Sequence, residues 1–197
     1  MGSKERIQRL KEENRINILE SSLRIVKEEG WQALSMRKIA DEIEYTAPMI
    51  YEYFPSKEAI LAELARQGHL LLARDMRTAK EAETNPEKQL EGMWLRYWNF
   101  AFTHKELYQL MFGVGITCCQ NKSEEGVVVF DLVCDSIRSV MNSEKPSEEI
   151  VSRKFYTYWS VIHGLVSINL VNGGVCERDN RQILKDAITA ITRSLKD

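Results

Sequence analysis

The sequence predicts an all-α protein, on the basis of three observations. Apolar residues recur at three- and four-residue spacing along most of the 197-residue chain. Prolines number only four, and capping residues or glycines separate the apolar patterns. The composition, 44% hydrophobic and 28% charged, is that of an ordinary globular chain. Because this length fits one domain or two small ones, the domain boundary has to come from the elements themselves.

The first helix is indicated by Ile16, Leu19 and Val26, which share one helical face. It is expected to end near Glu29, because the glycine that follows suits the left-handed residue that closes a helix. Ser35 then offers a side-chain oxygen to the free amides of a second, short helix. The residues Ile39, Ala40 and Ile43 supply its buried side.

A third helix begins only a few residues later. Thr46 is its capping candidate, and Pro48 stands in the first turn, where a missing N–H does no harm. Ile50 and Phe54 face inward at four-residue spacing, and Ser56 caps a fourth helix that begins near residue 57. Two short helices joined by a tight turn and braced by a third predict a helix-turn-helix, whose second member enters the DNA major groove.

The second part of the chain has a different composition, with many aromatic residues after about residue 92. Helical patterns are predicted over about 86–102, 105–112, 126–141, 147–171 and 179–195. The predicted domains are therefore 1–56, a helix-turn-helix domain, and 57–197, a helical domain.

The stretch "SMRKIADEIEYTAPMIYEYFPSKEAIL", residues 35–61, resembles the DNA-binding domain of TetR-type transcriptional regulators. The similarity is dense over about residues 17–64 and includes Ile39-Ala40, Ile50-Tyr51 and the "SKE" that follows Phe54. The stretch "WSVIHGLVSI" resembles the Trp, His-Gly signature of one subclass of C-terminal domains, the WHG type. The resemblance implies an N-terminal DNA-binding domain and a C-terminal domain that binds an effector and dimerises.

The resemblance also implies a set of DNA contacts. Two residues at the start of the second helix would approach phosphates, four would form the leading end of the recognition helix, and three would touch backbone or sugar. In chain order these are Ser35 and Arg37; Thr46, Ala47, Pro48 and Met49; and Tyr51, Tyr53 and Lys57. Hydroxyl groups and cations suit phosphate oxygens. The alternative is that Tyr51 and Tyr53 are half-buried packing residues.

Two features depart from the family pattern. Glu44 stands at the turn position where the family most often has glycine, so either a left-handed residue costs about 1 kcal/mol there or the turn differs. Residues 35–57 carry three basic against four acidic residues, and the recognition helix has no Lys or Arg. We therefore expect base readout through hydroxyl and apolar contacts, with Thr46 at a base edge and Ala47 or Met49 on thymine methyl groups.

The missing positive charge has a candidate source ahead of the first apolar pattern. Five cations stand there: Lys4, Arg6, Arg9, Lys11 and Arg15. They could act as an arm along the phosphates, or they could belong to a solvated, frayed helix end. The net charge of −2 means that the whole chain does not attract DNA as a polycation.

The last predicted helix carries a continuous apolar stripe. Its members are Leu184, Ala187, Ile188, Ile191 and Leu195. The stripe could pack within the chain, but the family pairs through its last two helices, and a helix-turn-helix protein reads a palindrome as a pair. The resemblance therefore predicts a homodimer through a four-helix bundle.

Aromatic and methionine side chains of the C-terminal part are candidate walls of an effector chamber. They are Trp94, Trp98, Phe102, Met111, Phe112, Trp159 and His163. Such side chains line apolar pockets, but at helical spacing they can equally be core residues. The implied mechanism is that a small, largely apolar effector favours a conformer that cannot hold its palindromic operator, as in a repressor.

Other classes of function receive little support. No phosphate loop or nucleophile elbow is present, and His69, His104 and His163 form no triad or metal pattern, so we expect neither an enzyme nor a cofactor or metal. No apolar run approaches the ~20 residues of a membrane helix, and the charged N-terminus is unlike a signal peptide, so we expect a cytoplasmic protein. A helical adaptor without specific DNA binding is the alternative. Adjacent Cys118 and Cys119 could form a redox switch or serve as apolar filler.

Overall fold

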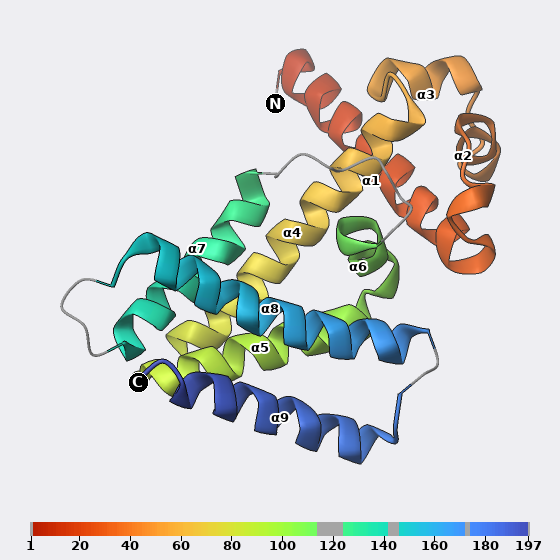
Figure 1. The fold of residues 1–197 in the computed structure, drawn as a ribbon. Helices are drawn as coiled ribbons and strands as arrows, with labels where there is room; N and C mark the ends of the chain where they lie inside the picture. Colours follow the sequence, from red (N-terminus) through yellow and green to blue (C-terminus); the bar gives the residue numbers. More distant parts are fainter. Residues whose placement is uncertain (1, 114–123, 142–145, 172–173, 197) are drawn as a thin grey trace. The chain divides into compact units, whose positions relative to one another are not determined.

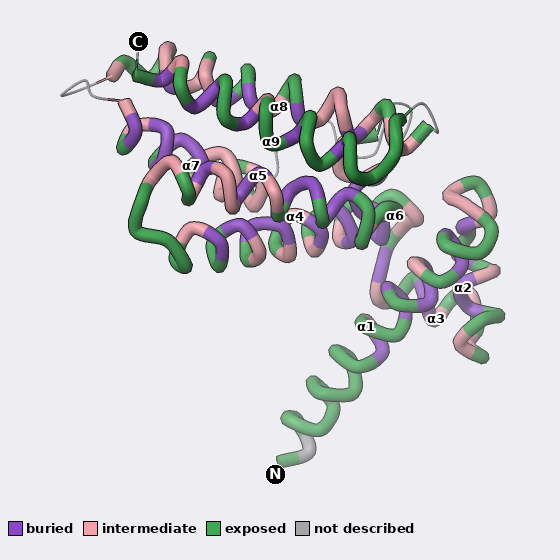
Figure 2. The backbone as a smooth tube through the Cα atoms, turned by 90° about the horizontal axis from the view of Figure 1, so that it is seen from below, coloured by how far each residue is buried: buried purple, intermediate pink, exposed green. Residues whose placement is uncertain are grey.

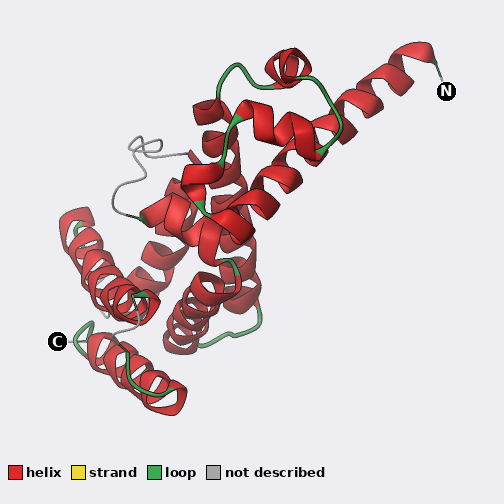
Figure 3. Cartoon of the chain, turned by 90° about the vertical axis from the view of Figure 1, so that its right-hand side faces the viewer, coloured by secondary structure: helices red, strands yellow, loops and turns green. Residues whose placement is uncertain are grey.

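The structure, a computed structural model, describes residues 2–113, 124–141, 146–171 and 174–196. Over these residues it contains helices and no strand, which confirms the all-α prediction (Figures 1 and 3). The elements are α1 (Ser3–Glu29), the short 3₁₀ turn η1 (Trp31–Ala33), α2 (Met36–Glu42), α3 (Ala47–Tyr53), α4 (Lys57–Glu81), α5 (Pro86–Thr103), α6 (Lys105–Phe112), α7 (Glu124–Val140), α8 (Glu148–Leu170) and α9 (Glu177–Arg193).

The described residues form two compact units. The first lies within Met1–Gln67 and Glu106–Gln120, and the second within Gly68–Lys105 and Asn121–Asp197. Helix α4 contributes to both units, so the predicted boundary after residue 56 falls at the start of a helix inside the first unit.

The first unit is built around an apolar core from α1 to α4. Ile18, Ile39 and Ile50 are fully buried, one each from α1, α2 and α3, and Phe54 is buried just after α3. Local signals set the helix ends as predicted. Gly30 closes α1 with a φ of 84°, and the Ser35 hydroxyl accepts from the Lys38 amide at the start of α2.

The turn between α2 and α3 contains a residue in the left-handed conformation, which is one of the two possibilities that the sequence allowed for Glu44. Glu44 has a φ of 58°, and the Tyr45 amide donates to the Ala40 carbonyl at 2.8 Å. Thr46 stands at the N-cap position of α3, but its side chain makes no capping hydrogen bond. The turn therefore has the conformation that glycine would favour, although a glutamate occupies it.

In the second unit α5 packs against α7, α8 and α9. Trp94 is buried at the centre of the unit, with its ring stacked on Tyr158 at 5.5 Å and edge-on to Tyr97 at 5.6 Å. The purple segments of Figure 2 mark the buried faces of these helices.

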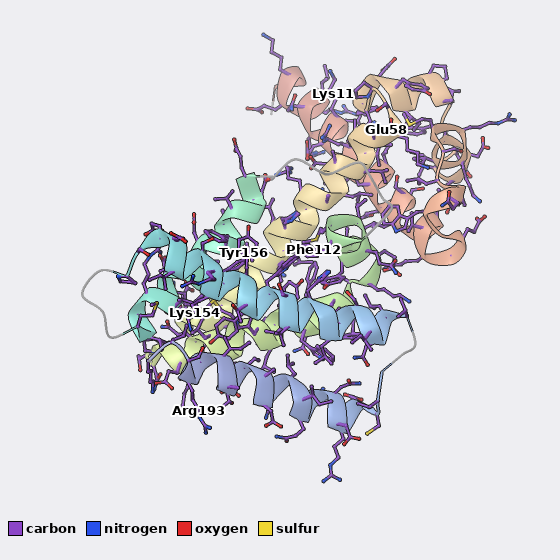
Figure 4. All side chains as sticks on the ribbon, viewed as in Figure 1. Lys11, Glu58, Phe112, Lys154, Tyr156 and Arg193 are labelled. Carbon is purple, nitrogen blue, oxygen red and sulfur yellow. The ribbon has the colours of Figure 1, made fainter. Side chains whose placement is uncertain are left out.

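Three polar contacts show that α8 and α9 run antiparallel. Lys154 of α8 donates to the Ser194 carbonyl at 2.6 Å, close to the end of α9 (Figure 4). The Tyr158 hydroxyl pairs with Thr192 at 2.7 Å, and Asn180 donates to Asn169 at 2.7 Å. These contacts define the seam between the two helices.

The apolar stripe of the last helix is part of this core, which corrects its predicted role at a dimer interface. Leu184, Ile188, Ile191 and Leu195 are buried within the single chain, and Ala187 is half-buried. The stripe faces α5 and α8, and these two helices of the same chain cover it. A second copy would have to meet α8 and α9 on their other faces.

Candidate nucleic-acid interface and effector domain

Helix α3 exposes the residues that the sequence predicts at its leading end. Thr46 and Pro48 are exposed, Ala47 and Met49 are half-buried, and Tyr51 is 53% exposed. Ile50, in the same helix, is fully buried and anchors α3 in the core. Tyr51 is therefore not a half-buried packing residue, since more than half of its side chain is exposed to solvent.

Tyr53, by contrast, is tied into the first unit. The buried Asn14 of α1 donates from its amide to the Tyr53 hydroxyl at 2.9 Å and accepts from the Tyr45 hydroxyl at 2.8 Å. One side chain thus joins α1 to the turn before α3 and to the last residue of α3. This arrangement fixes α3 on α1, because moving α3 would break hydrogen bonds in a partly buried site.

Arg15, the next residue, adds a second tie at the same place. Its guanidinium lies 4.3 Å from the centre of the Phe54 ring and 3.5 Å from a Glu63 carboxylate oxygen. Among the causes that lower the pKa of Glu63, the hydrogen bond from Arg66 comes first, and the charges of Arg66 and Arg15 add to it. Arg15 is therefore a packing and ion-pair residue, which argues against including it in a phosphate-binding arm.

The cations near α3 divide into paired and unpaired ones. Lys38 forms an ion pair with Glu29, and Lys57 donates to the Trp31 carbonyl at 3.3 Å. Arg37 is exposed and, within the part of the chain that the structure describes, makes no ion pair. Ser35 is exposed as well, close to it in the sequence.

The basic N-terminal segment is helical, since α1 begins at Ser3. Residues 4–13 are exposed throughout, as the green N-terminal turns of α1 in Figure 2 show. Arg9 pairs with Glu13 at 3.4 Å, whereas Lys4, Arg6 and Lys11 make no ion pair among the described residues. Lys11 (Figure 4) lies one helical turn before Arg15, which donates to the carbonyl of Tyr53 at 3.4 Å. The last turn of the segment thus lies close in the chain to Arg15, which contacts the end of α3.

The predicted effector residues do not form one group. Trp94 is a core residue, and its buried indole N–H has no hydrogen-bond partner among the described residues. Phe102 is 42% exposed, and its ring lies 4.8 Å from that of Trp98 at a tilt of 50°, so it is no wall of an enclosed chamber. Met111 and Phe112 lie on α6, which belongs to the first unit, whereas the other five lie in the second.

Trp159 and His163 are brought together on α8. Their rings stack at 4.8 Å, and His163 Nδ1 lies 3.2 Å from the Tyr97 hydroxyl of α5. Burial lowers the pKa of His163, because it disfavours the charged imidazolium. Tyr156 and Phe130 extend this aromatic row from α8 to α7, with their rings 6.4 Å apart.

The cysteines are divided by burial. Burial raises the pKa of the Cys134 thiol to about 12, so this residue is an inert, apolar filler. Cys176 is exposed at the start of α9, and Cys118 and Cys119 lie outside the described residues. The described residues contain no group of side chains that could hold a metal ion.

Sequence reasoning missed Asn14 and Tyr45. The available signal was the position of Asn14, four residues before Ile18 on the apolar face of α1, where a polar side chain needs a partner. No helix among the described residues is long and apolar enough to cross a membrane.

Comparison with solved structures supports this architecture. A protein of unknown function from Rhodococcus sp. RHA1 is similar with a TM-score of 0.78 at 21% identity, over 93% of this chain and 95% of that one. The TetR family transcriptional regulator PfmR from Thermus thermophilus has a TM-score of 0.65 at 16% identity, over 91% and 99%. A TetR family regulator from Marinobacter aquaeolei has a TM-score of 0.63 at 17% identity, over 93% and 97%. No curated protein matches.

Family models match both parts of the sequence. The model of bacterial regulatory proteins of the tetR family matches residues 18–64, which include α2 and α3. The model of the tetracyclin repressor-like C-terminal domain matches residues 90–191, more than half of the chain. With the helix-turn-helix and helical second unit described above, these matches show that the chain belongs to the TetR family of DNA-binding transcriptional regulators.

Proposed function

We propose that this chain is a homodimeric repressor that binds a palindromic operator and is released by a small, largely apolar effector. The observation that carries the DNA-binding part is the exposed leading side of α3, held on α1 by Asn14. A recognition helix must be both accessible and rigid to read base edges. The exposure of α3 and its hydrogen bonds to Asn14 support this part of the proposal.

Base readout in this proposal depends on hydroxyl and apolar groups. Thr46 has an exposed side chain that is not used as a helix cap, so its hydroxyl is available for a base edge. Ala47 and Met49 offer methyl groups for thymine. Tyr51 and Arg37, both exposed, are suited to the phosphate backbone, with Lys4, Arg6 and Lys11 as further phosphate contacts.

The proposed dimer uses exposed apolar residues beside the seam between α8 and α9. Val161 lies three residues after Tyr158 and Ile168 one residue before Asn169, both seam residues of α8. On α9, Ile183 lies three residues after Asn180. All three are exposed in the single chain, so that a second copy could bury them in a four-helix bundle.

The effector is assigned to the side of α8 that carries Trp159 and His163. The aromatic row on α8 offers apolar surface, and the pair of Tyr97 and His163 offers polar atoms that could orient the bound effector. Binding must favour the conformer with low operator affinity, since equal affinity for both conformers would change nothing.

A selection from random duplex DNA, followed by footprinting, tests the DNA-binding proposal. We expect a protected palindrome, and Thr46→Val should weaken binding to it by about tenfold, as the loss of one base contact does. Thr78→Val is the matched control, because Thr78 is an exposed threonine on α4 in the second unit. A chain that enriches no sequence at low salt would instead be a helical adaptor.

A further inference from the structure

A groove between α5 and α9 of the second unit has no role in the function proposed above. Its volume is about 740 Å³, within the range of small-molecule sites. Helix α5 contributes Leu95, Trp98 and Asn99, and α9 contributes Glu177, Arg178, Arg181, Gln182, Leu184 and Lys185. Trp159 and His163 do not line it, so it is separate from the aromatic row on α8.

The apolar part of the lining is continuous with the core. Leu184 is fully buried, Trp98 is 8% exposed, and Leu95 is half-buried. The Trp98 ring also contacts the exposed Phe102 in a tilted arrangement. A flat apolar group placed here would cover the parts of Leu95 and Trp98 that still meet solvent, which stabilises binding through apolar burial.

The charges of the lining are mostly positive. Arg178, Arg181 and Lys185 follow one another at three- and four-residue spacing, so they share one side of α9. Arg181 is paired with Glu177 at 3.1 Å. Arg178 and Lys185 have no carboxylate partner within the residues that the structure describes.

Of the acidic residues of α9, only Glu177 lines the groove, and it is paired with Arg181. Asp179 and Asp186 do not line the groove, although they stand beside the cations in the sequence. The groove therefore collects positive charge in a chain whose net charge is −2. Ile183, which belongs to the face proposed for dimerisation, does not line the groove, so pairing through Ile183 would not use the lining residues.

We infer that this groove binds an amphipathic anion, a molecule with a flat apolar body and one carboxylate or phosphate group. The apolar body would lie on Leu95 and Trp98, and the anionic group would meet Arg178 and Lys185. Asn99 is exposed beside them and supplies an amide for a further hydrogen bond. The inference concerns binding alone and holds whether or not the protein represses transcription.

Calorimetric titration of the full chain with naphthoate and with naphthyl phosphate tests the inference, and naphthalenemethanol serves as the neutral analogue. We expect saturable binding of at least one anion, a shift of the Trp98 indole N–H resonance, and much weaker binding of the alcohol. The anion that binds more tightly identifies carboxylate or phosphate as the preferred group. Arg178→Gln and Lys185→Gln should each raise the Kd by about two- to fivefold, as expected for a partly exposed ion pair.

Arg193→Gln is the matched control, because Arg193 is an exposed arginine on the same helix, outside the groove (Figure 4). It changes the net charge equally and should leave the Kd unchanged. The inference is overturned by absence of saturable binding, by equally tight binding of naphthalenemethanol, or by equal weakening in Arg178→Gln and Arg193→Gln. Saturation that leaves the Trp98 resonance in place also overturns it, since the anion would then bind elsewhere.

Discussion

Single residues determine how α3 is held, and their roles were predictable to different degrees. Ser35, Pro48 and Gly30 act through local geometry, so the sequence alone indicates their places. The role of Asn14 depends on Tyr45 and Tyr53, which are 31 and 39 residues away, and no local pattern specifies such a pair. The hydroxyl of Tyr53, which is predicted to touch DNA, also accepts a hydrogen bond from Asn14, and position in the sequence did not indicate this contact.

Replacing Glu44 with glycine should stabilise the first unit. Its φ of 58° strains a residue with a Cβ atom, and glycine removes this strain. We expect Glu44→Gly to raise the free energy of unfolding by about 1 kcal/mol, measured by urea denaturation. Glu44→Ala is the control, since it removes the same charge but keeps the strained backbone. If alanine stabilises as much as glycine does, charge and not backbone strain is responsible.

His163 should be largely neutral at neutral pH. Burial lowers its pKa from the ordinary value of 6.5, so the folded state favours the neutral imidazole. The corresponding stability is fully present above pH 6.5 and is lost as the pH falls toward the folded-state pKa, because the unfolded state takes up the proton first. An NMR titration of the imidazole, assigned with His163→Asn, measures this pKa. A midpoint at or above 6.5 would contradict the buried placement of the ring.

At the scale of elements, helix positions were predicted well and helix faces less so. The predicted ranges 105–112 and 147–171 nearly coincide with α6 and α8, because caps and apolar periodicity are local. The stripe of α9 was assigned to the wrong contact. An apolar stripe shows that a helix needs a cover, but it does not distinguish α5 and α8 of the same chain from a second copy.

Aspartate substitutions on α8 and α9 should separate stability from dimerisation. Ile188→Asp places a carboxylate in the core of a single chain and should lower the free energy of unfolding by about 4 kcal/mol or more. Ile168 is 50% exposed, so Ile168→Asp should leave the fold intact and yield monomers in light scattering after size exclusion. Leu70→Asp, at an exposed apolar residue of α4, is the control and should stay dimeric. A dimeric Ile168→Asp would place the interface elsewhere.

On the scale of the whole molecule, affinity for DNA has to arise against an unfavourable net charge. The chain carries 27 basic and 29 acidic residues, so long-range attraction to phosphates is absent. Ion pairs within the first unit neutralise part of the acidic charge near α3, as Arg24 does for Glu42 at 2.8 Å. Among the residues that the structure describes, the cations of the first unit that have no ion pair and could contact DNA include Arg37 and Lys11.

The salt dependence of operator binding measures how many of these cations contact phosphates. If Arg6 and Lys11 each neutralise one phosphate, changing both to glutamine should reduce the slope of log affinity against log salt by about 1.8 per half-site, since each contact contributes about 0.9. Lys88→Gln is the control, because Lys88 is an exposed lysine of α5 without an ion pair among the described residues. An unchanged slope would assign α1 before Asn14 to a solvated helix end. In that case Arg37, with helix-end amides and hydroxyl groups, would have to position α3 on the phosphates.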